Sequence, residues 1–229
     1  MQTLIFPLAV ILTLAAYLFS RRLYLRYRHP LLNIVLVSTS IVIGVLLVCG
    51  ISYAQYVPAG NLMTLLLGPA TVALAVPLYR NRHLLRCYFI AILVSTLFGA
   101  LFSMITAGLI ARAGGMSNEL IVSLVPKSVT LPFAIDIVQI YGGSKALAVA
   151  FVVATGTLGS ILGAIFLSAI RIIDPVARGL ALGSVAHGQG TALALQEGEE
   201  AGSMAGLAMV LAGIMTTLLA PFLMPFLTR

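Results

Sequence analysis

The chain has 229 residues, of which 61% are hydrophobic and 8% are charged. Soluble domains carry about 25% charged residues, so this composition excludes a soluble globular protein. The formal net charge of +7 does not indicate nucleic-acid binding, because most of the arginines lie in two short segments between apolar runs. Those arginines are Arg21, Arg22, Arg26 and Arg28, then Arg80, Arg82 and Arg86. Basic residues in short loops set the orientation of a membrane protein.

Apolar runs near 20 residues recur along the whole chain, as in polytopic helical membrane proteins. They cover about 3–20, 31–50, 61–79, 87–111, 118–141, 146–170, 178–196 and 202–227. We predict an all-α membrane protein with about seven or eight transmembrane or re-entrant segments, including broken helices, in a single domain over residues 1–229. No basic residue precedes the first run, so we expect a retained first span with its N-terminus outside.

The segment Leu67–Pro77 contains Pro69 and Thr71. Its two prolines could open backbone groups, together with the Thr71 hydroxyl, toward a cavity. The alternative is a kinked packing helix with small residues at close helix contacts.

A weak internal sequence similarity links this segment to a later one. The pattern Pro-x-[Ser/Thr]-Val at Pro69 recurs 57 positions later at Pro126, and Gly99 and Gly156 keep that offset. Pro-interrupted segments in two halves of a chain often mark a transporter binding site, although chance matching is the alternative here.

Lys127 interrupts a stretch, 120–134, that otherwise has the hydrophobicity of a membrane span. A lysine at bilayer depth costs about 2.5–3.5 kcal/mol on insertion scales, so we expect it to face protein or a water-filled cavity. Pro126 and Pro132 flank it and free backbone groups by breaking the helix. A cation beside unwound backbone predicts a site for a small anion.

The hydroxyls of Ser128 and Thr130 would complete the hydrogen bonds of an anion held by Lys127. The half-helix after Pro132 would direct its positive N-terminal end at the same anion. Asp136 follows four residues later and could neutralise the lysine or take part in proton coupling. The alternative is that the lysine side chain extends to the membrane surface.

The distribution of basic residues favours a re-entrant segment at 118–141. If all eight segments cross the membrane, the inside carries eight Lys and Arg residues and the outside four. If this segment enters and leaves on one side while 178–196 crosses, the inside carries ten and the outside two. The second count fits the cytoplasmic excess of basic residues better. We therefore predict a re-entrant or broken helix pair at Pro126–Pro132.

A further polar stretch, 179–191, places His187 in an apolar run beside Gly188 and Gly190. The glycines would let backbone approach a ligand or let the helix unwind. His187 could donate to a carboxylate or relay protons near neutral pH. The alternative is a neutral histidine that is satisfied between helices.

Other chemistries have little support. Cys49 and Cys87 lie in or beside apolar runs and lack metal-ligand spacing, so we expect no disulfide, metal site or cofactor. The sequence has neither a Ser/His/Asp order with a nucleophile elbow nor a phosphate loop, so we expect no enzyme.

These segments resemble the LrgB/CidB family of bacterial membrane proteins, which includes the C-terminal half of the plastid glycolate/glycerate transporter. The resemblance covers nearly all of the chain and is sharpest at Pro126-Lys-Ser-Val-Thr130 and His187-Gly-x-Gly-Thr191. It also covers His29-Pro-Leu-Leu-Asn33, 67–79, Ala177-Arg-Gly179 and Gly206-Leu-Ala-Met209.

The resemblance implies a transporter of small monocarboxylates such as pyruvate, glycolate or glycerate in the bacterial inner membrane, with a smaller LrgA/CidA-like partner. A homo-oligomer, with a dimer favoured, is also expected. The alternative functions are a holin/antiholin-like regulator of murein hydrolase export and cell lysis, and a structural partner of the LrgA-like subunit. Neither requires a ligand at Lys127.

The sequence departs from many relatives at Ile34, Leu131, Asp136 and Leu193, where proline, threonine, glutamate and arginine are common. These differences leave the substrate open. We expect a substrate site near the membrane midplane, built from broken helices. Its predicted residues are Lys127, Ser128, Thr130, His187, Gly188, Gly190, Thr191 and Thr71, with helix breaks at Pro69, Pro77, Pro126 and Pro132 and proton coupling by His187 and Asp136.

Overall fold

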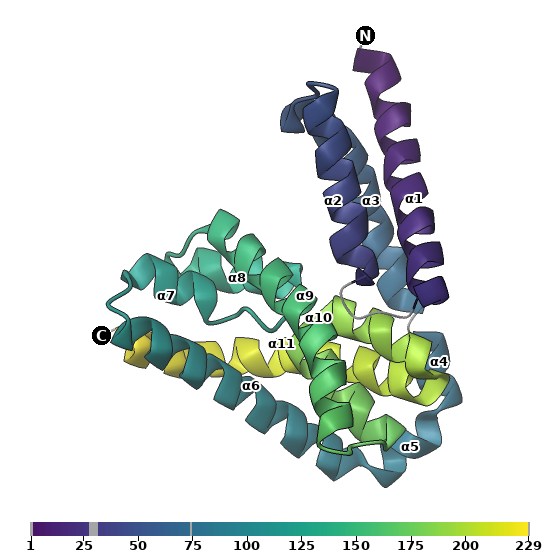
Figure 1. The fold of residues 1–229 in the computed structure, drawn as a ribbon. Coiled ribbons are helices and arrows are strands. Elements are labelled where there is room, and N and C mark those ends of the chain that lie inside the picture. Colours follow the sequence, from purple (N-terminus) through teal and green to yellow (C-terminus); the bar gives the residue numbers. More distant parts are fainter. Residues whose placement is uncertain (1, 28–31, 74, 229) are drawn as a thin grey trace. The chain divides into compact units, whose positions relative to one another are not determined.

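The computed structural model describes residues 2–27, 32–73 and 75–228 (Figure 1). Throughout those ranges the regular elements are helices, which confirms the predicted all-α class. Contacts divide the chain into two compact units, residues 1–76 and 77–229. Among the described residues, four helices are long and apolar enough to cross a membrane: Ile5–Tyr27, Phe89–Ala113, Lys145–Ala169 and Glu199–Leu227. The chain is a multi-pass membrane protein.

The first unit is built on three helices, of which the first packs against the other two. They are α1 (Gln2–Tyr27), α2 (Ile34–Val48) and α3 (Tyr53–Ala73). A hydrogen bond of 3.0 Å between the Thr13 and Tyr56 hydroxyls joins α1 to α3. Asn33 begins α2, because its side-chain oxygen accepts from the amides of Val35 and Leu36.

The Leu67–Pro77 segment does not form a broken hairpin over its described residues. Helix α3 continues through Pro69, and α4 (Ala75–Arg80), which contains Pro77, follows it. The Thr71 side chain lies outside what the structure describes, as do residues 29–31 of the family resemblance.

The second unit contains three long helices and several short ones. The long helices are α6 (Phe89–Ala113), α9 (Lys145–Ala169) and α11 (Glu199–Leu227), and the short α5 (Arg82–Cys87) precedes them. Helices α6 and α11 run in the same direction. Ile92 packs with Met204 near their starts, and Leu227 fills the space beside Gly108 near their ends.

A break between two short helices lies at the predicted Pro126–Pro132 segment. Non-helical backbone at 125–130 separates α7 (Asn118–Leu124) from α8 (Leu131–Tyr141). At 1.5 Å per residue these helices extend roughly 10 and 16 Å, whereas the hydrocarbon core is about 30 Å thick. Neither helix can cross the membrane alone.

The chain doubles back through this break. The Ser144 amide donates to the Ser123 hydroxyl at 2.8 Å, and Gly143 lies against Val122. Val122 packs in one cluster with Ala111, near the end of α6. The segment 118–143, here called the first hairpin, therefore enters and leaves at the end of the unit where α6 ends. This is the arrangement that the re-entrant prediction requires.

The prediction that 178–196 crosses the membrane is wrong. Helix α10 (Pro175–Glu197) is broken at His187, whose backbone angles are φ 40° and ψ −126°. The side chains of Arg178 and Glu197 meet at 2.6 Å, whereas 19 residues of straight helix would separate them by roughly 28 Å. Gly190 lies directly against the Leu182 carbonyl, so the two halves run back along each other. The segment 175–197 is here called the second hairpin.

The sequence hides this reversal because a hairpin of two apolar half-helices has the same hydropathy as one span. A crossing at 178–196 would put the acidic residues Glu197, Glu199 and Glu200 across the membrane from Arg178. In the structure they lie at the same end as Arg178, and Glu199 is 3.8 Å from Arg80.

The two hairpins enter the second unit from opposite ends. The first follows the end of α6, and the second follows the end of α9, which runs the other way. A long helix followed by a hairpin thus occurs twice with opposite direction, which is the pattern of the inverted repeats with which many transporters build a midplane site. The residues that cap the two hairpins, Ser117 and Asp174, are 57 positions apart, as are Gly99 and Gly156. The Pro-x-[Ser/Thr]-Val pattern at Pro69 does not mark this repeat, because Pro69 lies inside a continuous helix.

The doubling back of 175–197 predicts the labelling of single cysteines by a membrane-impermeant maleimide. Exposed Cys49 and Cys87 are first replaced by serine. Glu119→Cys and Lys145→Cys should react from one side, and Arg171→Cys and Glu200→Cys from the other, because all four positions are exposed at the ends of the unit. Labelling of Glu200→Cys from the Lys145 side would show that 175–197 crosses.

Candidate functional site

Lys127 lies at the tip of the first hairpin, in contact with hydroxyl groups. Its ammonium donates to Ser103 of α6 at 3.0 Å and lies 3.5 Å from the Ser128 hydroxyl. The Ser103 and Ser128 hydroxyls are 2.8 Å apart. One cation and two hydroxyls therefore form a cluster near the middle of α6. Ser103 was not predicted, because one serine in an apolar helix gives no signal of its role.

The cation has no anionic partner in the part of the chain that the structure describes. Ion pairs there join Arg80 to Glu199 and Arg178 to Glu197, at the far end of the unit. Asp136 is exposed on α8 and forms no ion pair with Lys127, so the predicted neutralisation does not occur in this structure. A charge held at this depth by neutral hydroxyls alone retains a strong electrostatic preference for an anion.

His187 lies at the tip of the second hairpin with a defined tautomer. Its Nε2 is 3.0 Å from the Val152 carbonyl of α9, and a carbonyl can only accept, so Nε2 carries a proton. The Thr191 hydroxyl donates to the His187 carbonyl at 2.9 Å, which satisfies a backbone group at the break. Nε2 and the backbone carbonyl of His187 therefore have partners within the protein, and Nδ1 has none among the described residues.

Gly156 of α9 makes room for this tip. A Cβ at that position would lie 2.6 Å from the His187 ring and 3.1 Å from the Gln189 amide nitrogen. Thr157 donates to the Gln189 side-chain oxygen at 3.1 Å, which leaves the amide NH₂ as a donor. Gln189 was also not predicted, because the sequence does not show that its side chain turns toward α9.

Helices α9 and α11 bring the two tips together. The Val152 side chain packs with Val129 and Ala134 of the first hairpin, while its carbonyl contacts His187 of the second. The Thr191 hydroxyl of the second hairpin contacts Met209 of α11. One turn further along α11, Gly213 lies against the Phe133 ring of the first hairpin. These positions lie near the middles of the two helices, which supports the predicted midplane location.

Two half-helices begin at these tips. Thr130 precedes α8, and its side chain makes no capping hydrogen bond, while Pro132 occupies the first turn. The second half of α10 begins after His187. The N-terminal end of a helix carries a partial positive charge and free amide donors, so both half-helices favour an anion between the tips.

The predicted site residues thus fall into two groups at adjoining tips. Lys127, Ser128 and Thr130 belong to the first, and His187, Gly188 and Thr191 to the second. Gly190 has a packing role instead, because its missing side chain lets the two halves of α10 meet. Pro126 is buried within the first break, whereas Pro132 starts α8.

A comparison with known proteins identifies the family of this chain. A model described as the LrgB-like family matches residues 13–226, nearly the whole chain. The chain belongs to the LrgB-like family. It is 40% identical over 208 residues to the uncharacterized protein YxaC of Bacillus subtilis, which covers 91% of this chain and 90% of that protein.

Two further relatives of this LrgB-like protein carry a functional name. The holin-like protein CidB of Staphylococcus epidermidis is 35% identical, and that of Staphylococcus aureus is 36% identical. Each alignment covers 203 residues, 89% of both chains. No solved structure matches the chain.

The close packing at Gly190 predicts a sharp contrast with its neighbour Gly188. A Cβ at Gly190 would overlap the Leu182 carbonyl, whereas one at Gly188 would meet nothing within 4 Å. We expect Gly190→Ala to destabilise the protein by about 1–3 kcal/mol and Gly188→Ala to change stability by less than about 0.5 kcal/mol. Thermal unfolding in detergent measures both. Equal melting temperatures for the two variants would contradict the backbone contact within α10.

Proposed function

We propose that this LrgB-like protein transports small monocarboxylate anions, of the pyruvate, glycolate or glycerate type, across the bacterial plasma membrane. The observation that carries the proposal is Lys127, a cation at a hairpin tip whose partners in the described structure are hydroxyls. A transported carboxylate would supply the missing negative charge and leave again, whereas a fixed aspartate or glutamate would compete with it.

The geometry supports specific roles. The carboxylate would accept hydrogen bonds from Lys127, Ser103 and Ser128, with the start of α8 beside it. The far end of the substrate would meet Thr191 and the Gln189 amide on the second tip. Proton coupling would use His187, whose Nδ1 is free to take up a proton while Nε2 stays bound to Val152. Asp136 lies outside this cluster, so the coupling rests on the histidine.

Charge distribution supports an orientation for the second unit. The end where α6 begins carries Arg80, Arg82, Arg86, Arg171 and Arg178, whereas Arg112 and Lys145 lie at the other end. The cytoplasmic excess of basic residues makes the first end cytoplasmic, so the first hairpin would enter from outside. The outside location of the N-terminus, the LrgA/CidA-like partner and the homo-oligomer, a dimer being favoured, remain predictions of the sequence.

The names of the relatives favour a second candidate. CidB proteins of two staphylococci are described as holin-like, which suggests a role in membrane permeability. In that function the Lys127 cluster would be structural, and flux would need neither saturation nor recognition of substrate shape.

Substitution of Lys127 separates these functions in proteoliposomes. We expect Lys127→Ala to weaken saturable uptake of radiolabelled pyruvate and glycolate by about 10- to 100-fold, because a hydrogen bond to a charged group contributes about 1.5–3 kcal/mol. Lys145→Ala removes an exposed lysine at the start of α9, beside the base of the same hairpin, and should leave uptake unchanged. Each protein is measured with and without an LrgA-like partner.

Two results would count against transport at this site. Unchanged uptake by a folded Lys127→Ala variant would remove the site assignment. Flux that does not saturate, ignores the difference between D- and L-glycerate and persists without Lys127 would support the holin-like function. Elution as a single peak in size-exclusion chromatography verifies folding.

A further inference from the structure

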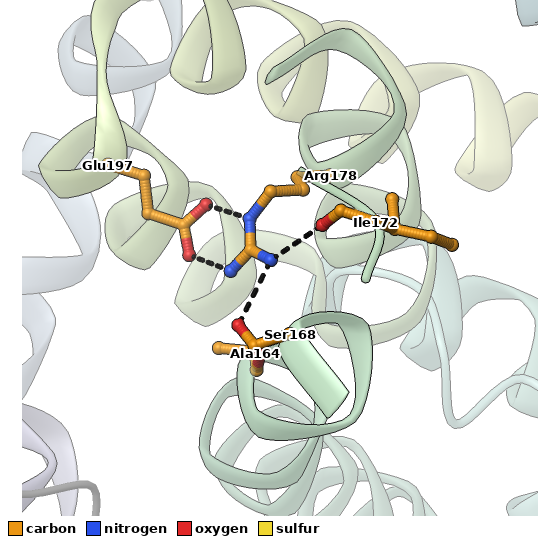
Figure 2. A network of polar contacts seen from close by, with 5 residues as sticks. All are labelled: Ala164, Ser168, Ile172, Arg178 and Glu197. Atoms are coloured by element: carbon orange, nitrogen blue, oxygen red, sulfur yellow. Dashed lines mark hydrogen bonds and ion pairs between the residues drawn. The ribbon is translucent and has the colours of Figure 1, made fainter. Parts of the chain in front are cut away.

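The second hairpin is closed at its base by a charged clamp (Figure 2). Arg178 donates from Nε and one Nη to the two oxygens of Glu197, at 2.7 and 2.6 Å. Its other Nη donates to the Ile172 carbonyl at 3.0 Å and to Ser168 at 3.2 Å. The Ser168 hydroxyl in turn donates to Ala164. One guanidinium thus fixes both halves of the hairpin to each other and to the end of α9.

The body and the tip of the second hairpin are also held, by close contacts with α11 and α9. Gly179 and Gly183 allow α10 to pack directly on the backbone of Ala201 and Ala205 in α11. At the tip, the hydrogen bond from His187 to Val152 ties the break to α9. Movement of the second hairpin away from α9 and α11 would break the Arg178 hydrogen bonds to the end of α9, the backbone-level packing and the hydrogen bond from His187. The Arg178–Glu197 ion pair holds the two halves of the hairpin to each other.

The first hairpin has a weaker attachment at its base, although its body packs in a hydrophobic cluster with α6 and α11. Its base is joined by a neutral hydrogen bond, from the Ser144 amide to the Ser123 hydroxyl. The charged residues beside that base, Glu119 and Lys145, are exposed and form no ion pair among the described residues. Gly143 faces the side chains of Val122 and Val138 and not a neighbouring backbone.

The first tip also carries the charge that a substrate would neutralise. Lys127 and Ser128 are tied to α6 through the Ser103 hydroxyl. An anion that binds more tightly when this tip is packed against α6, α9 and α11 shifts the population toward the packed state. An empty site leaves an uncompensated cation there, which weakens the packed state.

We propose that the first hairpin is the moving gate of the site, that the second hairpin is its fixed wall, and that an anion at Lys127 closes the gate. The proposal rests on the proposed anion site. It assigns access to the end of the unit where α6 ends, and it assigns the Arg178–Glu197 clamp to keeping the opposite base shut.

Hydrogen–deuterium exchange of the protein in lipid nanodiscs tests the gate without requiring transport. Amides of 118–143 should exchange at least about tenfold faster than those of 175–197, because a tenfold difference corresponds to only 1.4 kcal/mol in local opening. Sodium pyruvate or sodium glycolate, compared with sodium chloride, should slow exchange in 118–143 and leave 175–197 unchanged. Equal exchange, or faster exchange in the second hairpin, would overturn the proposal.

Three variants separate its parts. Lys127→Ala should keep the fast exchange of 118–143 and lose the protection by carboxylates, since the hairpin remains but the charge is gone. Arg178→Ala should speed exchange in 175–197 several-fold, whereas Arg171→Ala, at an exposed position nearby, should not. An unchanged second hairpin in Arg178→Ala would contradict the clamp.

A reversible crosslink connects the gate to transport. Ser123→Cys with Ser144→Cys, joined by a short bis-methanethiosulfonate, should abolish uptake until a reductant is added. Arg178→Cys with Glu197→Cys joined in the same way should retain it. Inhibition by the second crosslink alone would overturn the gate. If the reduced proteins transport no carboxylate, the proposed function fails, and exchange in the absence of ligand still decides whether the first hairpin is the mobile one.

Discussion

Backbone polar groups cannot be left unpaired in hydrocarbon, and the arrangement of the second unit depends on that constraint. Two breaks in helical structure lie near the middle of this unit, so protein must surround both. Helices α6, α9 and α11 surround the breaks, and their contacts include the Ser103 hydroxyl and the Val152 carbonyl. Gly156 lets the histidine ring lie against α9, and within α10 Thr191 satisfies the carbonyl freed at His187. The small residues that look unremarkable in the sequence allow the breaks to exist.

The two tips are related by an inverted repeat but differ in chemistry. The first has a cation and hydroxyls, whereas the second has an imidazole in a fixed tautomer and a primary amide. A ligand with one carboxylate and a polar group at its other end fits that difference. A dicarboxylate would place its second charge beside an uncharged amide and an imidazole that is cationic only after Nδ1 takes up a proton. The asymmetry of the tips is thus consistent with the proposed preference for monocarboxylates.

An inverted pair of hairpins also bears on the choice between transport and simple permeability. Transport requires that a central site open to one side at a time, and hairpins whose bases lie at opposite ends provide two separate routes. The bases are unequally attached, by an ion pair in one and a neutral hydrogen bond in the other. A holin-like assembly, the alternative suggested by the names of two staphylococcal relatives, would not need that inequality.

The sequence by itself determined the class, the family and the break around Lys127. Composition requires a membrane protein, and a lysine between two prolines cannot occupy a regular lipid-facing helix. The same reasoning failed at 178–196, because His187 breaks its helix without a proline and the two halves remain apolar. Only the tertiary structure decided that Arg178 meets Glu197, that Ser103 holds Lys127 and that Asp136 does not. Those contacts depend on which residues of different helices approach each other, and this cannot be deduced from hydropathy and spacing along one chain.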